Sequence, residues 1–115
     1  SITDPKFYKE YPFYFMAKIP PGTFEGINHT VYFPAFRVLM LTTAKISEED
    51  IYKLLKVIWE HRDEWKGVHA AVEKYVTLDQ ALWGVNIPLH PGAVKYYKEQ
   101  GFKIPDELVP PEMKG

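Results

Sequence analysis

The clearest fold signal is the stretch from residue 87 to residue 101, IPLHPGAVKYYKEQG. Pro91 suits the first turn of a helix, and Gly101 suits the position just after a helix end. The pattern predicts a helix over residues 93–100 that is capped by His90, with its paired tyrosines packed against the body of the protein. A second interpretation stays open, in which an anion or carboxylate is held at the helix N-terminus near Gly92 and Ala93.

A longer helix is expected to begin upstream at Ser47. The sequence SEED at residues 47–50 resembles a capping box, with acidic side chains at the positive end of the helix. Apolar residues then follow helical spacing at Ile51, Leu54, Leu55, Ile58 and Trp65. We predict an amphipathic helix over residues 51–64 that ends or bends near Gly67, and a shorter helix within residues 68–75.

Two extended segments precede this helix. Residues 11–19, YPFYFMAKI, are rich in aromatic and β-favouring residues and stop at the breaker PPG. After a loop over residues 23–30, residues 31–43, VYFPAFRVLMLTT, form the second extended run. Because Pro34 cannot donate to a strand ladder, the second strand lies at an edge or bends while passing between two bodies.

The remaining segments are short. Thr77 with Gln80 forms another capping-box pattern, and Gly84 suits the position after a brief helix that ends near Trp83. The tail after Ile104 contains three prolines and is expected to run irregularly along the surface. The elements together indicate the α/β class.

Composition limits the classes of partner. A chain of 115 residues fits one small domain, and fourteen basic against fifteen acidic residues give a net charge of −1, which argues against a nucleic-acid partner. No apolar run approaches the roughly 18 residues that a membrane span needs. The first residues, SITDP, do not resemble a secretion signal, so either the protein is cytoplasmic or its signal is missing from the sequence.

The sequence contains few groups that could carry chemistry. Zero cysteines exclude disulfides and thiol catalysis, and the four histidines show no close pairing or HExxH motif. Gly-rich phosphate loops and the GxSxG elbow are absent, and most acidic residues lie at helix starts or on solvated faces. We therefore expect no metal, no cofactor and no enzyme activity.

Several motifs resemble those of one known family and occur along the chain in the same order as in that family. Residues 88–93, PLHPGA, followed by YYKEQG at residues 96–101, are similar to the C-terminal hallmark of TAXI-type solute receptors of TRAP transporters. YPFY at residues 11–14, IPPGTF at residues 19–24, the run over residues 31–43 and the helix from Ser47 match further segments. The resemblance covers residues 11–102.

The resemblance implies the C-terminal part of a type II periplasmic-binding-protein fold, with crossover strands packed with several helices. Residues 1–115 would then be a single segment of a two-lobed protein whose N-terminal two-thirds, including the main ligand motif and the secretion signal, has no counterpart here. Such a receptor captures a small carboxylate, such as glutamate or a related organic acid, in the periplasm and delivers it to the TRAP membrane permease.

Ligand contact in this segment is expected from Thr30 and Tyr32, which are polar residues of the crossover region; lining the hinge is the other interpretation. The alternative function is a stand-alone protein-interaction module without a ligand site. A homodimer is also expected, formed by pairing of edge strands or exchange of residues 31–43, because a truncated fold exposes strand edges and apolar surface.

Overall fold

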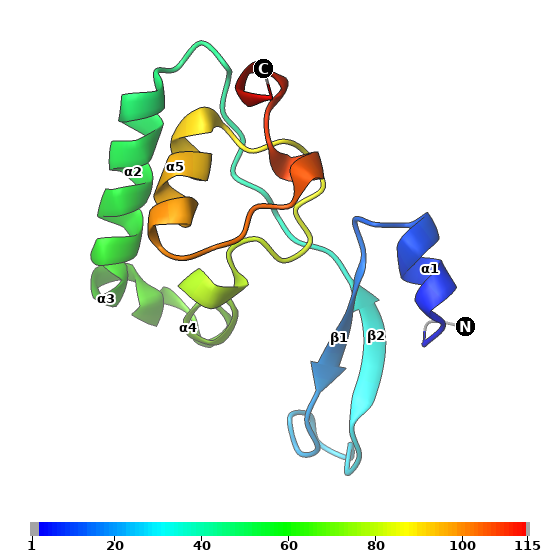
Figure 1. Cartoon of the computed structure of the whole chain (residues 1–115). Helices are drawn as coiled ribbons and strands as arrows, with labels where there is room; N and C mark the ends of the chain where they lie inside the picture. Colours follow the sequence, from blue (N-terminus) through cyan, green and yellow to red (C-terminus); the bar gives the residue numbers. More distant parts are fainter. Residues whose placement is uncertain (1–2, 115) are drawn as a thin grey trace. The chain divides into compact units, whose positions relative to one another are not determined.

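The computed structural model describes residues 3–114 (Figure 1). Contacts within the chain form two compact units. The first unit runs to Leu39 and includes Trp83–Val85, and the second contains Met40–Leu82 and the chain from Asn86 onward. The chain therefore leaves the first unit after Leu39 and returns to it only for three residues.

The first unit begins with a short helix, α1 (Pro5–Glu10). Asp4 caps this helix by accepting a hydrogen bond from the backbone N–H of Lys6 at 2.9 Å. Residues 11–14 form a turn after α1, so the predicted strand over residues 11–19 is wrong in its first half. The aromatic rings there pack on α1: the Phe7 ring lies 5.1 Å from that of Tyr11 and 5.9 Å from that of Tyr14.

The strands β1 (Phe15–Ile19) and β2 (Val31–Ala35) form an antiparallel hairpin. Phe15 pairs with Ala35 at one end, and Ile19 pairs with Val31 at the other. The prediction of a strand over residues 31–43 is therefore wrong beyond Ala35. The chain turns before Phe15, so β1 offers no residues with which the chain after Ala35 could pair.

The second unit contains the predicted amphipathic helix as α2 (Glu48–Glu60). The Ser47 hydroxyl accepts a hydrogen bond from the Asp50 N–H at 3.1 Å, which confirms the predicted cap. The helix is interrupted at His61 and resumes as α3 (Arg62–Trp65), before a 3₁₀ turn (Lys66–Val68) and α4 (Ala70–Tyr75). Helices within residues 51–64 and 68–75 are thus confirmed.

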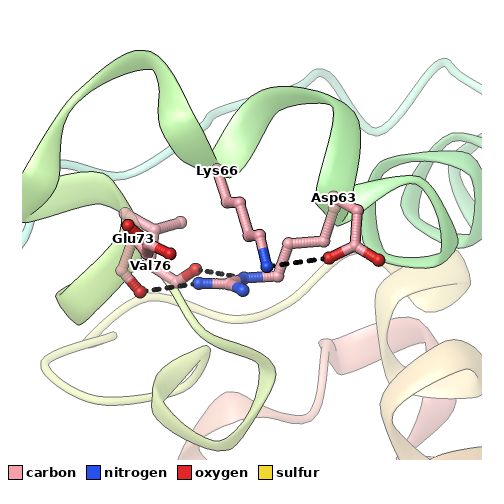
Figure 2. A network of polar contacts seen from close by, with 5 residues as sticks. Asp63, Lys66, Glu73 and Val76 are labelled. Carbon is pink, nitrogen blue, oxygen red and sulfur yellow. Dashed lines mark hydrogen bonds and ion pairs between the residues drawn. The ribbon is translucent and has the colours of Figure 1, made fainter.

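A polar network joins α3 to the end of α4 (Figure 2). The Arg62 guanidinium donates through Nε to the carbonyl of Val76 at 3.0 Å and through Nη2 to the carbonyl of Glu73 at 2.7 Å. Lys66 forms an ion pair with Asp63 at 3.0 Å. Since the last carbonyls of a helix lack partners within the helix, Arg62 closes α4.

The helix α5 (Pro91–Glu99) packs side by side with α2 and forms the core of the second unit (Figure 1). Val94 is fully buried, and Tyr96 and Tyr97 are 3% and 7% exposed, which confirms their predicted packing role. Gly101 has φ +91°, as expected of the residue that follows a helix end.

The tail differs from the prediction of an irregular surface segment. It forms 3₁₀ turns at Asp106–Leu108 and Pro111–Met113. Ile104 and Leu108 are buried, and the Leu108 carbonyl accepts a hydrogen bond from the Leu89 N–H at 2.8 Å. Ile104 and Leu108 therefore add to the core of the second unit.

The predicted capping box at Thr77 is wrong. The chain forms one 3₁₀ turn there (Leu78–Gln80), and the Thr77 side chain makes no capping hydrogen bond. The Gln80 side chain donates to the Lys74 carbonyl at 3.3 Å, so it is not available to complete a reciprocal cap. Gly84 has φ +73°, which permits the tight turn that follows.

The protein is thus a small mixed helix and strand structure with a two-stranded antiparallel sheet in its described part, consistent with the α/β class. Among residues 3–114, none of the helices has the length and apolar character needed to cross a membrane.

Candidate functional site

The N-terminus of α5 is closed by the protein itself. His90 Nδ1 accepts a hydrogen bond from the Gly92 N–H at 3.1 Å, and His90 Nε2 lies 2.8 Å from the Ile46 carbonyl oxygen, to which it donates. Gly92 and Ala93 are buried against α2. The capping interpretation is confirmed, and the interpretation as an anion site is wrong because the N–H groups of Gly92 and Ala93 both donate to His90.

The close approach of α5 to α2 depends on Gly92. A Cβ atom at this position would lie 2.3 Å from the Glu48 carbonyl oxygen and 2.7 Å from the Tyr52 nitrogen. These distances are far below van der Waals contact. The glycine of the sequence motif therefore serves helix packing.

Polar contacts along the same interface are also structural. The Tyr52 hydroxyl donates to Glu99 Oε2 at 2.5 Å, and this hydrogen bond raises the pKa of Tyr52. The Tyr97 hydroxyl accepts from Trp59 Nε1 at 3.3 Å, and burial raises the pKa of Tyr97. Both tyrosines stay protonated at neutral pH and link the two helices.

The predicted ligand residues lie at the far end of the hairpin. Thr30 is half-buried in the loop before β2, and Tyr32 is exposed on β2 opposite Lys18. The structure describes their positions, and their role in ligand binding stays a prediction.

Three side chains gather at the other end of the hairpin, and we call them the Arg37 cluster: Arg37, Phe15 and Trp83. The central carbon of the Arg37 guanidinium lies 5.4 Å from the centroid of the Phe15 ring and 5.8 Å from that of the Trp83 ring. Both distances fall within the range of a cation–π interaction. The cluster brings a permanent positive charge and two aromatic surfaces together inside the first unit.

Gly84 allows this assembly. A Cβ atom there would lie 3.1 Å from Arg37 Cγ and 3.2 Å from Phe15 Cδ1, and the positive φ of Gly84 disfavours other residues. Trp83 itself is 53% exposed, so one side of the cluster faces solvent.

The structure does not bring Tyr32 to the Arg37 cluster. Phe15 pairs with Ala35 and Lys18 with Tyr32, so Phe15 and Tyr32 lie three register positions apart and on opposite faces of the hairpin. Our sequence analysis missed Arg37, although it is the only charged residue in the apolar run over residues 31–43. The contribution of Trp83 carries no sequence signal, because it depends on the return of residues 83–85 to the first unit.

The described residues include no group of three or more histidine, aspartate or glutamate side chains that could hold a metal ion. An open surface depression in the second unit is lined by Leu78, Asp79, Gln100, Gly101 and Phe102. This depression has a single charged side chain and offers little that would orient a ligand.

Comparison with known families supports a more general family assignment than the sequence motifs suggest. The model of the NMT1-like family matches residues 4–101, which include the hairpin, α2 and α5. This family is of the periplasmic-binding type, so the match supports the resemblance to solute receptors in its general form. The chain therefore belongs to the NMT1-like family.

Proposed function

We propose that this chain is the C-terminal portion of a TAXI-type solute-binding subunit of a TRAP transporter. The complete receptor captures a small carboxylate, such as glutamate or a related organic acid, in the periplasm and presents it to the membrane permease. The family match over residues 4–101 is the observation that carries the proposal. The hallmark at residues 88–101 supports the narrower TAXI assignment by resemblance.

The division of the chain agrees with this proposal. In a two-lobed receptor a crossover strand leaves one body and enters another. Here the run over residues 31–43 starts as β2 in the first unit and passes into the second unit after Leu39. The hallmark then forms α5 and packs on α2, which gives the second unit a core of its own.

The proposed role is binding and delivery without catalysis. The permanent charge of Arg37 and the polar residues of the first unit suit recognition of an anion, whereas the perturbed tyrosines of the second unit are used in helix packing. The solute is held together with the lobe that this sequence does not contain, as the resemblance implies.

A stand-alone interaction module is the second candidate. It is favoured by an apolar segment that follows β2, in which Phe36, Val38, Met40 and Leu41 are all strongly exposed. Several exposed apolar side chains within one segment are typical of a segment that contacts another protein.

Native mass spectrometry and cell fractionation test the proposal. The protein is expressed from its complete natural coding region, purified without added solute, and the bound small molecules are released and identified. We expect a stoichiometric small carboxylate and recovery of the protein in the periplasmic fraction. Recovery in the cytoplasm with no bound solute would contradict the receptor function and support the interaction module.

A further inference from the structure

We propose that the outer edge of β1 is a dimer interface, at which the strand pairs antiparallel with β1 of a second copy of this chain. The pairing places Ala17 on the twofold axis, opposite Ala17 of the second copy. The inference goes beyond the proposed function and does not depend on the solute or on the membrane permease.

The sheet of the first unit has two unpaired edges. In the described part of the chain it contains only β1 and β2, so each strand has one edge without a partner strand. A two-stranded hairpin is marginally stable in water, and further strands with an apolar face stabilise it. One face of this hairpin is entirely apolar and only half-buried, and it consists of Phe15, Ala17, Ile19, Val31, Phe33 and Ala35.

Pro34 determines which backbone groups face these edges. In an antiparallel ladder, pairs that exchange both N–H···O bonds alternate with pairs that exchange none. Met16 and Pro34 cannot form a bonded pair, because proline lacks the N–H. The bonded pairs are therefore the flanking ones, such as Ala17 with Phe33. The N–H and C=O groups of Met16 and Lys18 consequently point away from β2, to the outer edge of β1.

The two edges differ in what they offer to a further strand. The outer edge of β2 presents Tyr32 and Pro34, and the missing N–H of Pro34 partly blocks it. The outer edge of β1 presents a complete N–H and C=O set at both Met16 and Lys18. Within residues 3–114, neither residue takes part in a backbone hydrogen bond outside the hairpin. A further strand is therefore expected beside β1.

Two of the three antiparallel registers that would bring two such edges together fail. An axis at Met16 pairs Lys18 with Tyr14, whose N–H already donates to the Tyr11 carbonyl at 3.0 Å. An axis at Lys18 pairs Met16 with Pro20, which has no N–H to donate. The same axis places the two Lys18 ammonium groups directly opposite each other, which is destabilising.

An axis at Ala17 satisfies both edges. Met16 then lies opposite Lys18 of the second copy, and the same pair recurs across the axis, so each outward N–H meets a C=O. Lys18 is exposed, and its methylene stem covers Met16 of the second copy while its ammonium group stays in water. A lysine on an edge normally discourages pairing, and only this register separates the two lysines. An edge that is complementary to itself in one register favours a symmetric dimer.

Cysteine cross-linking of the 115-residue chain tests the register, because the sequence has no cysteine of its own. Ala17→Cys should form a disulfide between two copies under mild oxidation, since the Cα separation of about 4.5 Å in a non-bonded pair suits a disulfide. Ala35→Cys on β2 and Ile19→Cys on the same face of β1 are the controls. Ile19 lies four register positions from its counterpart, about 14 Å away, and should not link. Non-reducing electrophoresis over a concentration series measures the linked dimer, and urea should abolish it.

Charge at position 16 tests the same register by the sign of its effect. Met16 is 46% exposed, so its replacement leaves the fold intact. Met16→Glu places a carboxylate opposite Lys18 of the second copy twice and should tighten the dimer about fivefold, whereas Met16→Lys should weaken it by about as much, as measured by sedimentation equilibrium. The gain from Met16→Glu should decline in high salt. Met113→Glu and Met113→Lys are matched controls of similar exposure in the second unit and should leave the affinity unchanged.

Three results would overturn the interface: linking at Ala35→Cys or Ile19→Cys as strong as at Ala17→Cys, equal effects of the two charges at Met16, or a monomer of 13.4 kDa at every concentration up to about 1 mM. A dimer that responds to neither set of variants is held by another surface, and it too would overturn the pairing of β1. None of these results bears on the receptor function, which the co-purified solute tests separately.

Discussion

Replacement of Gly92 by alanine should weaken the contact between α2 and α5. A Cβ atom at position 92 would lie 2.3 Å from the Glu48 carbonyl oxygen, whereas ordinary carbon–oxygen contacts begin at about 3.3 Å, so the helices must separate by about 1 Å. A gap of this size forfeits roughly a quarter to a half of the dispersion energy of each contact it opens.

The expected change in the free energy of unfolding follows from two opposing effects. Overpacking against rigid backbone atoms costs about 3 kcal/mol, at the upper end of the usual range, because backbone cannot move aside as a side chain can. Alanine returns about 1 kcal/mol through its better helix propensity. We therefore expect Gly92→Ala to lower the free energy of unfolding by about 2 kcal/mol.

Urea denaturation followed by tryptophan fluorescence measures this change. A Trp83→Phe background leaves Trp59 and Trp65 as reporters, and both belong to the second unit. Gly67→Ala is the matched control, since a Cβ atom there has no neighbour within 4 Å, and its effect should stay within about 0.5 kcal/mol. Equal stability of the two alanine variants would refute the close packing of α2 on α5.

Four further predictions concern stability, pH, ligand and assembly. Ser47→Ala should cost about 1 kcal/mol by removing the cap of α2, as measured by urea denaturation with circular dichroism, and Ser47→Asp should restore it. Because burial raises the pKa of Tyr97 above that of an unfolded chain, the contribution of Tyr97 to stability should be fully present below about pH 10 and be lost as the pH rises further. Tyr97→Phe should reduce that loss, and an unchanged slope in alkaline urea titrations would contradict the assignment. Calorimetry of the 115-residue chain should show no saturable heat with glutamate or small dicarboxylates below millimolar ligand, because the other lobe is needed for tight binding; a micromolar dissociation constant would show that a full site is present. Sedimentation at micromolar concentration should reveal a dimer, since Phe36, Val38, Met40 and Leu41 are exposed, and a monomer of 13.4 kDa would argue against it.

The helices were largely predictable from the sequence, because their signals are local. Ser47 and the apolar period after it predicted α2, and His90, Pro91 and Gly101 predicted α5 with its cap. A cap depends on hydrogen bonds between residues two or three positions apart, and periodicity reports the buried face directly. The broad assignment to a solute-receptor type also came from the motifs, and the family match supports it.

Strand limits and the Arg37 cluster depended on tertiary structure. A strand continues only where a partner strand runs beside it, so β2 ends at Ala35 where β1 begins at Phe15, although the sequence stays β-favouring to residue 43. The break of the long helix at His61 could not be predicted from the sequence either, because the helical spacing of apolar residues continues to Trp65. Arg37 meets Trp83 because the chain returns to the first unit after Met40–Leu82, which belongs to the second unit. The sequence alone therefore determined the local elements whose hydrogen bonds close within a few residues, and the tertiary structure decided which distant side chains meet, because that depends on pairing and packing across the whole chain.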